Sequence, residues 1–368
     1  MQKLSAVFSI LCSSAVALFS SLALAQSGTA NTATPSDKTP PLTCQSKTQK
    51  INEQRFVLIG GIKQWVTIKG NSCANPVILI VHGGPGNPLT PYAANMYADW
   101  ENDFTLALWD QRGAGLTYGE NKPAAGATLT LEQLSNDGVE LAAYLTHYLG
   151  QKKLILMGGS WGSILGVYMV KAQPALFQAY IGTAQVVSYR DNQTATYTKL
   201  QALARATDDK ATLTTLDTMG APPWTNPRNF GIVRRILRKY EAKVSTPPPA
   251  NWWVPAAAYT TPKILADFEE SEEYSFVQFV GMHGDGMFSK VDLPKLETKF
   301  DVPFFLVQGE EDLLSTPEIA QRYFDSITAP KKAFVLVPHA GHDPNQVTLD
   351  AQYKLLKESV SQSADLKK

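Results

Sequence analysis

The sequence predicts an α/β fold in which helices cover a mostly parallel, doubly wound sheet. Short apolar runs typical of strands buried on both faces recur along the chain, at residues 77–81, 104–109, 154–157, 179–187, 304–307 and 333–337. Segments with helical patterning separate most of these runs, and such alternation is typical of parallel sheets. Glycine-rich turns directly follow several of the runs, at the end of a strand where the ligand-binding loops of such sheets lie.

The first 25 residues have the pattern of a secretory signal peptide. Lys3 supplies a positive charge, residues 4–22 are apolar or small, and residues 23–25 give an A-x-A cleavage site. An uncleaved membrane anchor is the alternative, because the stretch is nearly long enough to span a bilayer. Its many serines and the A-x-A site favour cleavage. We therefore expect an exported protein, periplasmic or secreted, whose mature form has no membrane span.

Residues 26–50 are rich in Ser, Thr, Pro and Asn, which predicts a flexible lead-in. Removal of the signal leaves two cysteines, Cys44 and Cys73. An even pair in an exported protein predicts a disulfide, with two free thiols as the alternative. The bridge would close a loop of 29 residues and would stabilise the fold by about 3–4 kcal/mol through the lost entropy of the unfolded chain.

Composition narrows the classes of function. Lys and Arg number 33, as do Asp and Glu, so there is no basic field that would attract nucleic acid. Hydrophobic residues make up 44% of the chain, enough for a sizeable core. No Cys or His cluster has the spacing of metal ligands, and we expect neither a metal nor another cofactor. The expected partner is a peptide or a small-molecule substrate.

The alternation of strands and helices is interrupted once. Residues 51–187 and 301–368 carry it and are expected to form one core, whereas residues 188–300 have helical tendency and several proline clusters. Because this segment lies between two core strands, it is an insertion, and a cap over the active site is its expected place. A structural excursion on the far side of the molecule is the alternative.

The strongest chemical signal is Gly158-Gly159-Ser160-Trp161-Gly162, a G-x-S-x-G sequence between a predicted strand and a predicted helix. A nucleophile on such a sharp turn has strained backbone, and side chains two positions before and after it would collide with the neighbouring strand and helix. The turn exposes the serine hydroxyl above the sheet and directs the positive end of the helix at the reacting centre. Ser160 is therefore the predicted nucleophile. The alternative is that this short pattern occurs here by chance.

A serine nucleophile needs a base, and the base needs an orienting acid. His342 follows a glycine in a loop beyond the last predicted strand, and we prefer it to His339, which lies nearer the strand end. Asp312 lies three residues past a glycine, where the turn should direct it back toward the histidine; Glu310 and Glu311 are its rivals. The resulting chain order, serine then aspartate then histidine, is one of the known orders for such a set.

The negative charge that develops on an attacked carbonyl needs backbone donors. We expect them to be the N–H groups of Trp161 and of Gly84 in the HGGPG loop, each worth about 3–4 kcal/mol of barrier. That loop lacks the Gly-Lys-Ser/Thr of a phosphate-binding loop. His82 is expected to brace the loop, and Asp110 and Arg112 to pair with or brace neighbouring loops.

Three motifs together resemble the proline iminopeptidase family of α/β-hydrolases, over about residues 55–345. They are HGGPG at 82–86, WDQRGAG at 109–115 and GGSWGS at 158–163. The resemblance implies a serine peptidase with a helical cap that removes an N-terminal residue, usually proline, through an acyl-enzyme. It also implies acidic cap residues that hold the free amine. The candidate for this amine-binding group is the run Glu269-Glu270-Ser271-Glu272-Glu273. The alternative is that the run is a solvated acidic helix face.

Three functions are compatible with these patterns. The first is an aminopeptidase that releases N-terminal proline or another small residue. The second is an esterase or amidase of the same fold, in which Trp224, Trp252 and Trp253 accept an apolar acyl group; an absolute need for a free amine separates the two. The third is a non-catalytic binding module, against which the intact serine, aspartate and histidine argue.

Overall fold

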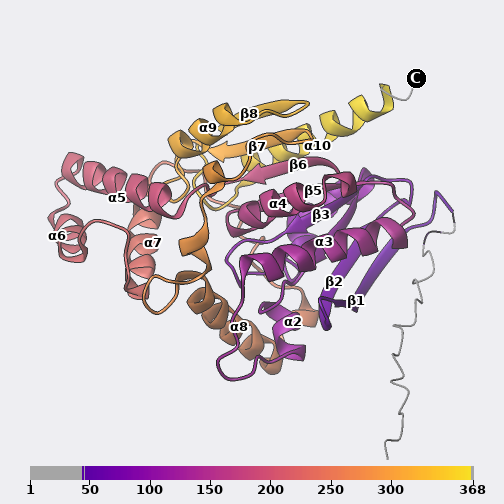
Figure 1. The fold of residues 1–368 in the computed structure, drawn as a ribbon, viewed down its shortest axis with the longest axis horizontal. Helices are drawn as coiled ribbons and strands as arrows, with labels where there is room; N and C mark the ends of the chain where they lie inside the picture. The colour runs from indigo at the N-terminus through magenta and orange to yellow at the C-terminus, as the bar shows by residue number, and fades with distance from the viewer. Residues whose placement is uncertain (1–43, 45, 366–368) are drawn as a thin grey trace, which may run out of the picture. The chain divides into compact units, whose positions relative to one another are not determined.

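The computed structural model describes residue 44 and residues 46–365, and a mixed eight-stranded sheet forms its centre (Figure 1). The strands are β1 (Ile51–Ile59), β2 (Ile62–Gly70), β3 (Val77–Val81), β4 (Thr105–Trp109), β5 (Leu154–Gly159), β6 (Phe177–Thr183), β7 (Phe304–Gly309) and β8 (Lys332–Val337). Strands β3 to β8 are parallel, whereas β1 and β2 form a hairpin that joins β4 antiparallel. The predicted mostly parallel sheet is confirmed. The predicted signal peptide, and the lead-in apart from residues 44 and 46–50, lie outside the described residues.

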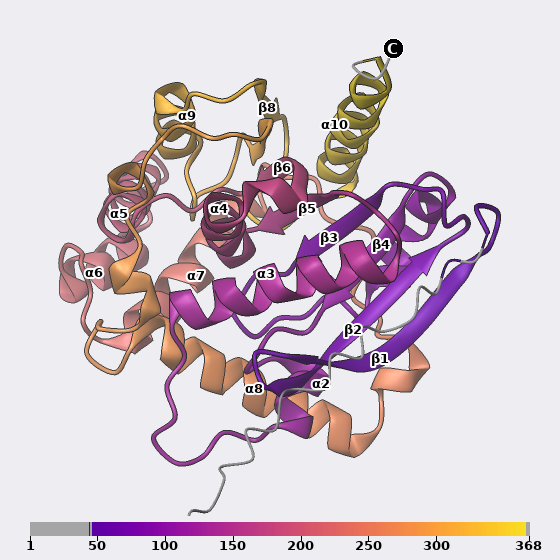
Figure 2. The same ribbon diagram turned by 45° about the vertical axis from the view of Figure 1, so that its right-hand side comes forward.

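Helices cover both faces of the sheet, as a doubly wound fold requires. They are α1 (Ala93–Tyr97), α2 (Gly115–Glu120), α3 (Leu131–Tyr148), α4 (Trp161–Ala172), α5 (Tyr189–Ala206), α6 (Lys210–Met219), α7 (Pro227–Glu241), α8 (Pro262–Val280), α9 (Pro317–Ser326) and α10 (Gln346–Asp365). Figure 2 shows α3 and α4 side by side across one face. In β3, Leu79 packs in a core with α3, α4 and α9, whereas its neighbour Ile80 packs in a second core with α1 and α10.

The strand order explains where the functional loops meet. Along the sheet the order is β1-β2-β4-β3-β5-β6-β7-β8, so β3 lies between β4 and β5. Val81 at the end of β3 is paired with Gly158 near the end of β5. Ligands of open α/β sheets bind beyond the carboxyl ends of the strands at such a switch of direction. The loop after β3 and the turn after β5 are therefore neighbours at this edge.

One predicted strand is too long. The apolar run 179–187 was expected to be extended throughout, but β6 ends at Thr183 and Ala184 has a positive φ of 48°. The chain turns because buried polar partners satisfy its backbone outside the sheet: the N–H of Gln185 donates to the side chain of Gln308, and the N–H of Val187 donates to Asn192. The run stays apolar because the loop itself is buried.

Local chemistry defines both ends of α3 and the first loop of the chain. Thr130 caps α3, since its hydroxyl accepts a hydrogen bond from the N–H of Gln133 at 3.0 Å. Gly150, just past this helix, has the positive φ of 64° expected at a helix end. Cys44 and Cys73 form the expected disulfide, with Cα atoms 5.7 Å apart.

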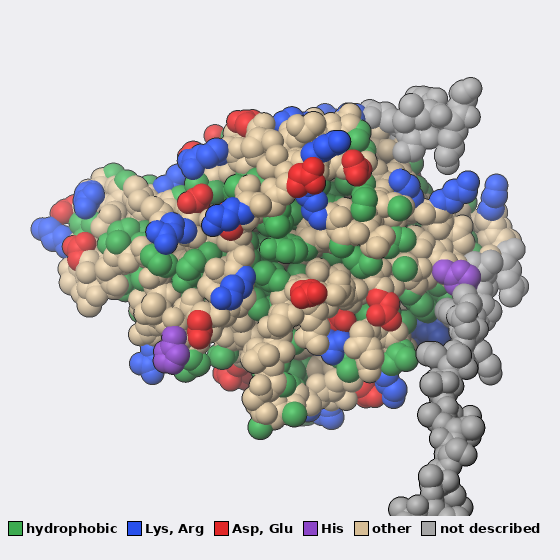
Figure 3. All heavy atoms as spheres, viewed as in Figure 1, with side chains coloured by type: hydrophobic (Ala, Val, Ile, Leu, Met, Phe, Trp, Pro, Cys, Tyr) green, Lys and Arg blue, Asp and Glu red, His purple; other side chains and the backbone are tan. Residues whose placement is uncertain are grey.

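Helices α5 to α8 occupy the predicted insertion between β6 and β7. In Figure 1, α5, α6 and α7 are grouped beyond one end of the strands, and α8 runs beside α2. On the face shown in Figure 3, acidic and basic side chains are interspersed, in keeping with the balanced composition. No helix in the described part of the chain has both the length and the apolar character needed to cross a membrane.

Candidate active site

The turn after β5 has the strained geometry that the sequence predicts. Ser160 adopts φ 52° and ψ −119°, a conformation that residues other than glycine rarely hold. A Cβ on Gly158 would clash with the carbonyl oxygen of Gly162, and a Cβ on Gly162 would clash with that of Val81. Both glycines are therefore required by close backbone approach. The turn places Ser160 immediately before α4, which begins at Trp161.

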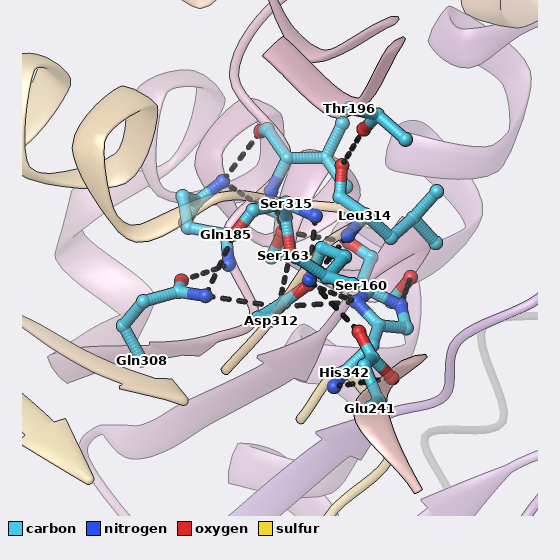
Figure 4. Close-up of polar contacts among 12 residues, drawn as sticks. Ser160, Ser163, Gln185, Thr196, Glu241, Gln308, Asp312, Leu314, Ser315 and His342 are labelled. Atoms are coloured by element: carbon cyan, nitrogen blue, oxygen red, sulfur yellow. Dashed lines mark hydrogen bonds and ion pairs between the residues drawn. The ribbon is translucent and has the colours of Figure 1, made fainter. Parts of the chain in front are cut away.

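The structure brings Ser160, His342 and Asp312 into one hydrogen-bonded chain (Figure 4). The Nε2 atom of His342 lies 2.9 Å from the Oγ of Ser160, and its Nδ1 lies 3.1 Å from each carboxylate oxygen of Asp312. Ser160 follows β5, Asp312 follows β7 and His342 follows β8. The rivals are placed elsewhere: His339 and Glu310 are exposed, and Glu311 has no hydrogen bond to the imidazole.

Neighbouring donors hold the Asp312 carboxylate. It accepts hydrogen bonds from the backbone N–H groups of Leu314 and Ser315, from the Ser315 hydroxyl at 2.6 Å, and from the amide of Gln308 at 2.9 Å. Burial raises the pKa of Asp312, but the charge of His342 and these hydrogen bonds outweigh it, and the net pKa lies below its ordinary value. Asp312 is therefore ionised and oriented toward the imidazole.

The same pairing acts on His342. Burial lowers its pKa, whereas the charge and the hydrogen bond of Asp312 raise it, and the net pKa lies above 6.5. With Asp312 ionised, Nδ1 carries the proton and Nε2 is the acceptor that faces the Ser160 hydroxyl. This tautomer can take a proton from the serine.

Glu241, at the end of α7, is a buried carboxylate that sequence reasoning missed. One of its oxygens accepts a hydrogen bond from the N–H of Leu313 at 2.8 Å, and the other lies 3.4 Å from the N–H of His342. It thus joins the loops that carry Asp312 and His342 to the insertion. Nothing in the sequence distinguishes it from a solvated glutamate at a helix end. Burial and the charge of Asp312 raise its pKa to about 7.

This raised pKa has a measurable consequence for stability. The folded chain holds the Glu241 proton more tightly than the unfolded chain, whose glutamate titrates near 4.5. The wild type should therefore lose stability as pH rises from 4.5 to about 7, by up to roughly 3 kcal/mol from this group. Glu241→Gln removes this titration. We expect the free energy of urea unfolding of the variant, relative to wild type, to rise between pH 5 and pH 8.

The control for this experiment is Glu132→Gln, which changes an exposed glutamate on α3. Its unfolding free energy should follow the wild-type pH dependence. Parallel curves for wild type and Glu241→Gln across this pH range would show that the Glu241 pKa is not raised in the folded protein.

The predicted oxyanion donors lie beside the serine. The N–H groups of Trp161 and Gly84 have no acceptor among the described residues, and a Cβ on the adjacent Gly83 would lie 3.4 Å from the Cβ of Ser160. His82 braces this loop, as expected: its Nδ1 lies 2.8 Å from the carbonyl of Gly83, and its Nε2 accepts from a backbone N–H of the WDQRGAG motif. Burial lowers the pKa of His82 to about 4, so the ring is neutral.

The side chains of the WDQRGAG motif brace the segments around the site. Gln111 accepts a hydrogen bond from the indole of Trp161 at 2.9 Å and donates to the carbonyl of His82. Asp110 and Arg112 brace neighbouring loops, as expected: Asp110 accepts from Thr90, and Arg112 pairs with Asp137 at 2.7 Å.

Helix α8 packs directly against glycines of the HGGPG and WDQRGAG motifs. The Ser275 hydroxyl of α8 donates to the carbonyl of Gly113, and the N–H of Gly115 donates to the Ser271 hydroxyl. A Cβ on Gly86 would lie within 2.9 Å of the Ser275 side chain. The absence of side chains therefore lets α8 lie directly on both loops, and this places its acidic run beside the active site.

A cavity of about 1080 Å³ opens at this site, between the sheet and the insertion. Ser160 and His342 line it, together with Glu269, Glu272 and Glu273 of α8. Glu270 does not line the cavity and pairs with Lys122. Glu272 accepts a hydrogen bond from Asn87, in the loop after β3, at 3.1 Å.

The aromatic residues of the insertion are only partly as expected. Trp253 lines the cavity and is 44% exposed, whereas Trp252 packs in the core beneath the sheet. Trp224 lines the cavity too but is buried in a core within the insertion. The adjacent residues Trp252 and Trp253 therefore lie in different environments, and the sequence alone does not reveal this difference. Other rings on the cavity wall are Phe230, Phe276, Phe279 and Phe288.

No group of three or more potential metal ligands occurs among the described residues.

The fold and the arrangement of the nucleophile turn define an α/β-hydrolase. Residues 72–345 match the family model described as "Serine aminopeptidase, S33", and the chain belongs to this family.

Curated relatives carry related names. The chain is 27% identical over 298 residues to "Probable aminopeptidase YbaC" of Bacillus subtilis, covering 78% of this chain and 89% of the relative. It is 26% identical over 293 residues to "Probable proline iminopeptidase" of Streptomyces coelicolor, covering 76% and 85%. The crystal structure of a proline iminopeptidase from Mycobacterium smegmatis superposes with a TM-score of 0.59 at 21% identity, covering 84% of this chain and 97% of that one. This last likeness shows the shared fold.

Proposed function

We propose that the protein is a serine aminopeptidase that releases N-terminal proline or another small residue from peptides. The observation that carries this proposal is the hydrogen-bonded chain of Ser160, His342 and Asp312, whose first two members line a cavity that three glutamates also line. Family membership and the names of the curated relatives support it.

In the proposed mechanism, the Oγ of Ser160 attacks the carbonyl carbon of the scissile bond while Nε2 of His342 takes its proton. The N–H groups of Trp161 and Gly84 stabilise the oxyanion, and Asp312 stabilises the imidazolium. His342 then gives the proton to the leaving amine, which departs and leaves an acyl-enzyme. Water, activated by His342, attacks the acyl-enzyme and releases the free residue.

The glutamates of α8 are proposed to hold the substrate amine. An ammonium group that leaves water needs a carboxylate partner, because its desolvation is otherwise uncompensated. Glu272 is the leading candidate, since Asn87 orients it from the loop that also carries Gly84. Glu269 and Glu273 also line the cavity, and each lies within one helical turn of Glu272.

The test is a comparison of prolyl-naphthylamide, its N-acetylated form and a short p-nitrophenyl ester. We expect cleavage of the free-amine substrate and no detectable cleavage of the acetylated one. Of Glu269→Gln, Glu272→Gln and Glu273→Gln, at least Glu272→Gln should lower kcat/KM for prolyl-naphthylamide by about 10- to 100-fold, as for loss of a charge-assisted hydrogen bond. Ester cleavage should change little.

Glu270→Gln is the matched control, because this glutamate belongs to the same run but pairs with Lys122 away from the cavity. It should retain wild-type kinetics. Ester cleavage without any proline activity would overturn the aminopeptidase proposal and favour the esterase or amidase, whose apolar acyl group the aromatic cavity wall would accept.

We also propose that the protein is exported. The apolar segment and A-x-A site near the N-terminus support this, as does the disulfide of Cys44 with Cys73, since disulfides persist in oxidising compartments. Mass spectrometry of the protein isolated from its native host should find an N-terminus at Gln26. An intact Met1 would contradict cleavage.

A further inference from the structure

The cavity contains a cation without a partner. Arg234 of α7 lines the cavity and is half-buried, yet its guanidinium forms no ion pair or hydrogen bond with any described residue. The next arginine along this side of the helix differs, since Arg238 pairs with Asp343 at 3.6 Å and is largely exposed. Of these two cations at the cavity, Arg234 is thus the more buried and the unpaired one.

Arg234 lies on the helix that contacts the loop of His342, and both residues line the cavity. Residues 234, 238 and 241 are spaced by four and three positions and share one face of α7. On this face Glu241 contacts the loop of His342, and Arg238 pairs with the residue after His342. Arg234 continues the same row by one turn, toward the cavity. Burial and the positive charge of Arg234 both oppose the rise in the His342 pKa that Asp312 causes.

An unpaired, partly desolvated guanidinium favours the binding of an anion. Removing a charge from water costs free energy unless a partner of opposite charge compensates. Arg234 stays protonated, and its planar fork of donors matches a carboxylate. The carboxylates whose charges act on it, Asp343, Glu241 and Glu272, do not pair with it. A carboxylate on the substrate would complete the pair.

The position of Arg234 decides which part of the substrate it contacts. His342 must hand its proton to the leaving amine, so the leaving group lies beside the imidazole. The proposed amine-binding glutamates belong to another wall, on α8. The cavity thus has negative charge on one wall and an unpaired positive charge on another. A dipeptide has the same distribution, with an ammonium on its first residue and a carboxylate on its second.

We propose that Arg234 binds the free carboxylate on the leaving-group side of the substrate, and that dipeptides with a free C-terminus are the preferred substrate class. This proposal extends the aminopeptidase function proposed above, and rests on it for the identity of the acyl part. The contact to the carboxylate itself depends only on the leaving group.

The experiment compares prolyl-alanine with its C-terminal amide, using purified full-length protein. Wild type should show a kcat/KM for the free acid at least 10-fold above that for the amide. Arg234→Gln should reduce this preference by about 10- to 100-fold, as for loss of a charge-assisted hydrogen bond, and Arg234→Lys should retain part of it. Any change in the His342 pKa on removing Arg234 affects both substrates alike and cancels in the ratio.

Two controls separate recognition from general damage. Arg235→Gln, an exposed neighbour on α7 that does not line the cavity, should keep the wild-type preference. Prolyl-naphthylamide has no carboxylate, so Arg234→Gln should lower its kcat/KM at least 10-fold less than that of prolyl-alanine, and measurable cleavage of this substrate shows that the variant is folded. A wild type that does not distinguish acid from amide, or an Arg234→Gln variant with an unchanged preference, would overturn the proposal.

Failure of the aminopeptidase function is recognised separately. If no proline substrate is cleaved, the same ratio is measured for 4-acetoxybenzoate against 4-acetoxybenzamide, esters whose leaving groups differ in the same carboxylate. A preference for the acid that Arg234→Gln reduces by at least 10-fold would support the anion site on a different hydrolase. An equal ratio in both proteins would remove it.

Discussion

Replacing Ser160 with alanine is expected to lower kcat about 10⁶-fold on any substrate that the protein cleaves, because the attacking oxygen is lost and the rest of the set cannot act without it. The release of naphthylamine or nitrophenol measures this. A fluorophosphonate should add one covalent mass to wild type and none to Ser160→Ala. The alanine variant should remain folded, since the Oγ of Ser160 lies at the cavity rather than in the core.

Ser326→Ala is the matched control, because this exposed serine at the end of α9 is remote from the nucleophile turn and its hydroxyl bonds only to the carbonyl of Tyr323. It should keep wild-type activity and labelling. Substantial hydrolysis by Ser160→Ala, or labelling of another residue, would exclude Ser160 as the nucleophile.

The second large effect is expected for Asp312→Asn, about 10⁴-fold in kcat, because an amide in place of the carboxylate favours the wrong imidazole tautomer. A shift in pH dependence should accompany the loss. Wild-type kcat/KM should fall as pH drops through the His342 pKa, above 6.5, since the protonated ring cannot accept the proton of Ser160. Without the charge of Asp312, burial dominates and this acid limb should move to lower pH.

Glu310→Gln and Glu311→Gln test the rival acids in the same turn. Both should retain the wild-type rate and pH profile, because neither side chain contacts the imidazole. A loss of several orders of magnitude in either variant, with Asp312→Asn active, would assign the acid to that glutamate instead. An Asp312→Asn profile with an unshifted acid limb would mean that Asp312 does not set the His342 pKa.

Local sequence patterns were sufficient for most strands of the core and for the turn that carries the serine. The apolar run before Gly158 and the glycines at 158 and 162 specify a strand, a turn and a helix within a few residues. Gly158 is required by a contact inside the turn itself, whereas Gly162 is also required by the backbone of Val81 in β3. His342 and Asp312 were also predictable from their places after strands, since parallel strands deliver their following loops to one edge.

Other features needed the tertiary structure. The apolar run 179–187 was predicted as one strand, but its second half is a loop whose burial comes from distant partners. Trp252 and Trp253 are adjacent in sequence, yet one lies in the core and the other at the cavity. Burial of a side chain in an insertion depends on how its helices dock, and no local pattern records this.

The sequence by itself therefore determined the mostly parallel sheet and the turn that holds Ser160. Which members of the acidic run face the cavity was decided by the docking of α8 on the glycines of two other loops. The contact of Glu241 with the His342 loop and the unpaired state of Arg234 follow from the placement of α7. The physical reason is that strand and turn preferences act between near neighbours, whereas the pairing of charges depends on contacts between segments far apart in the chain.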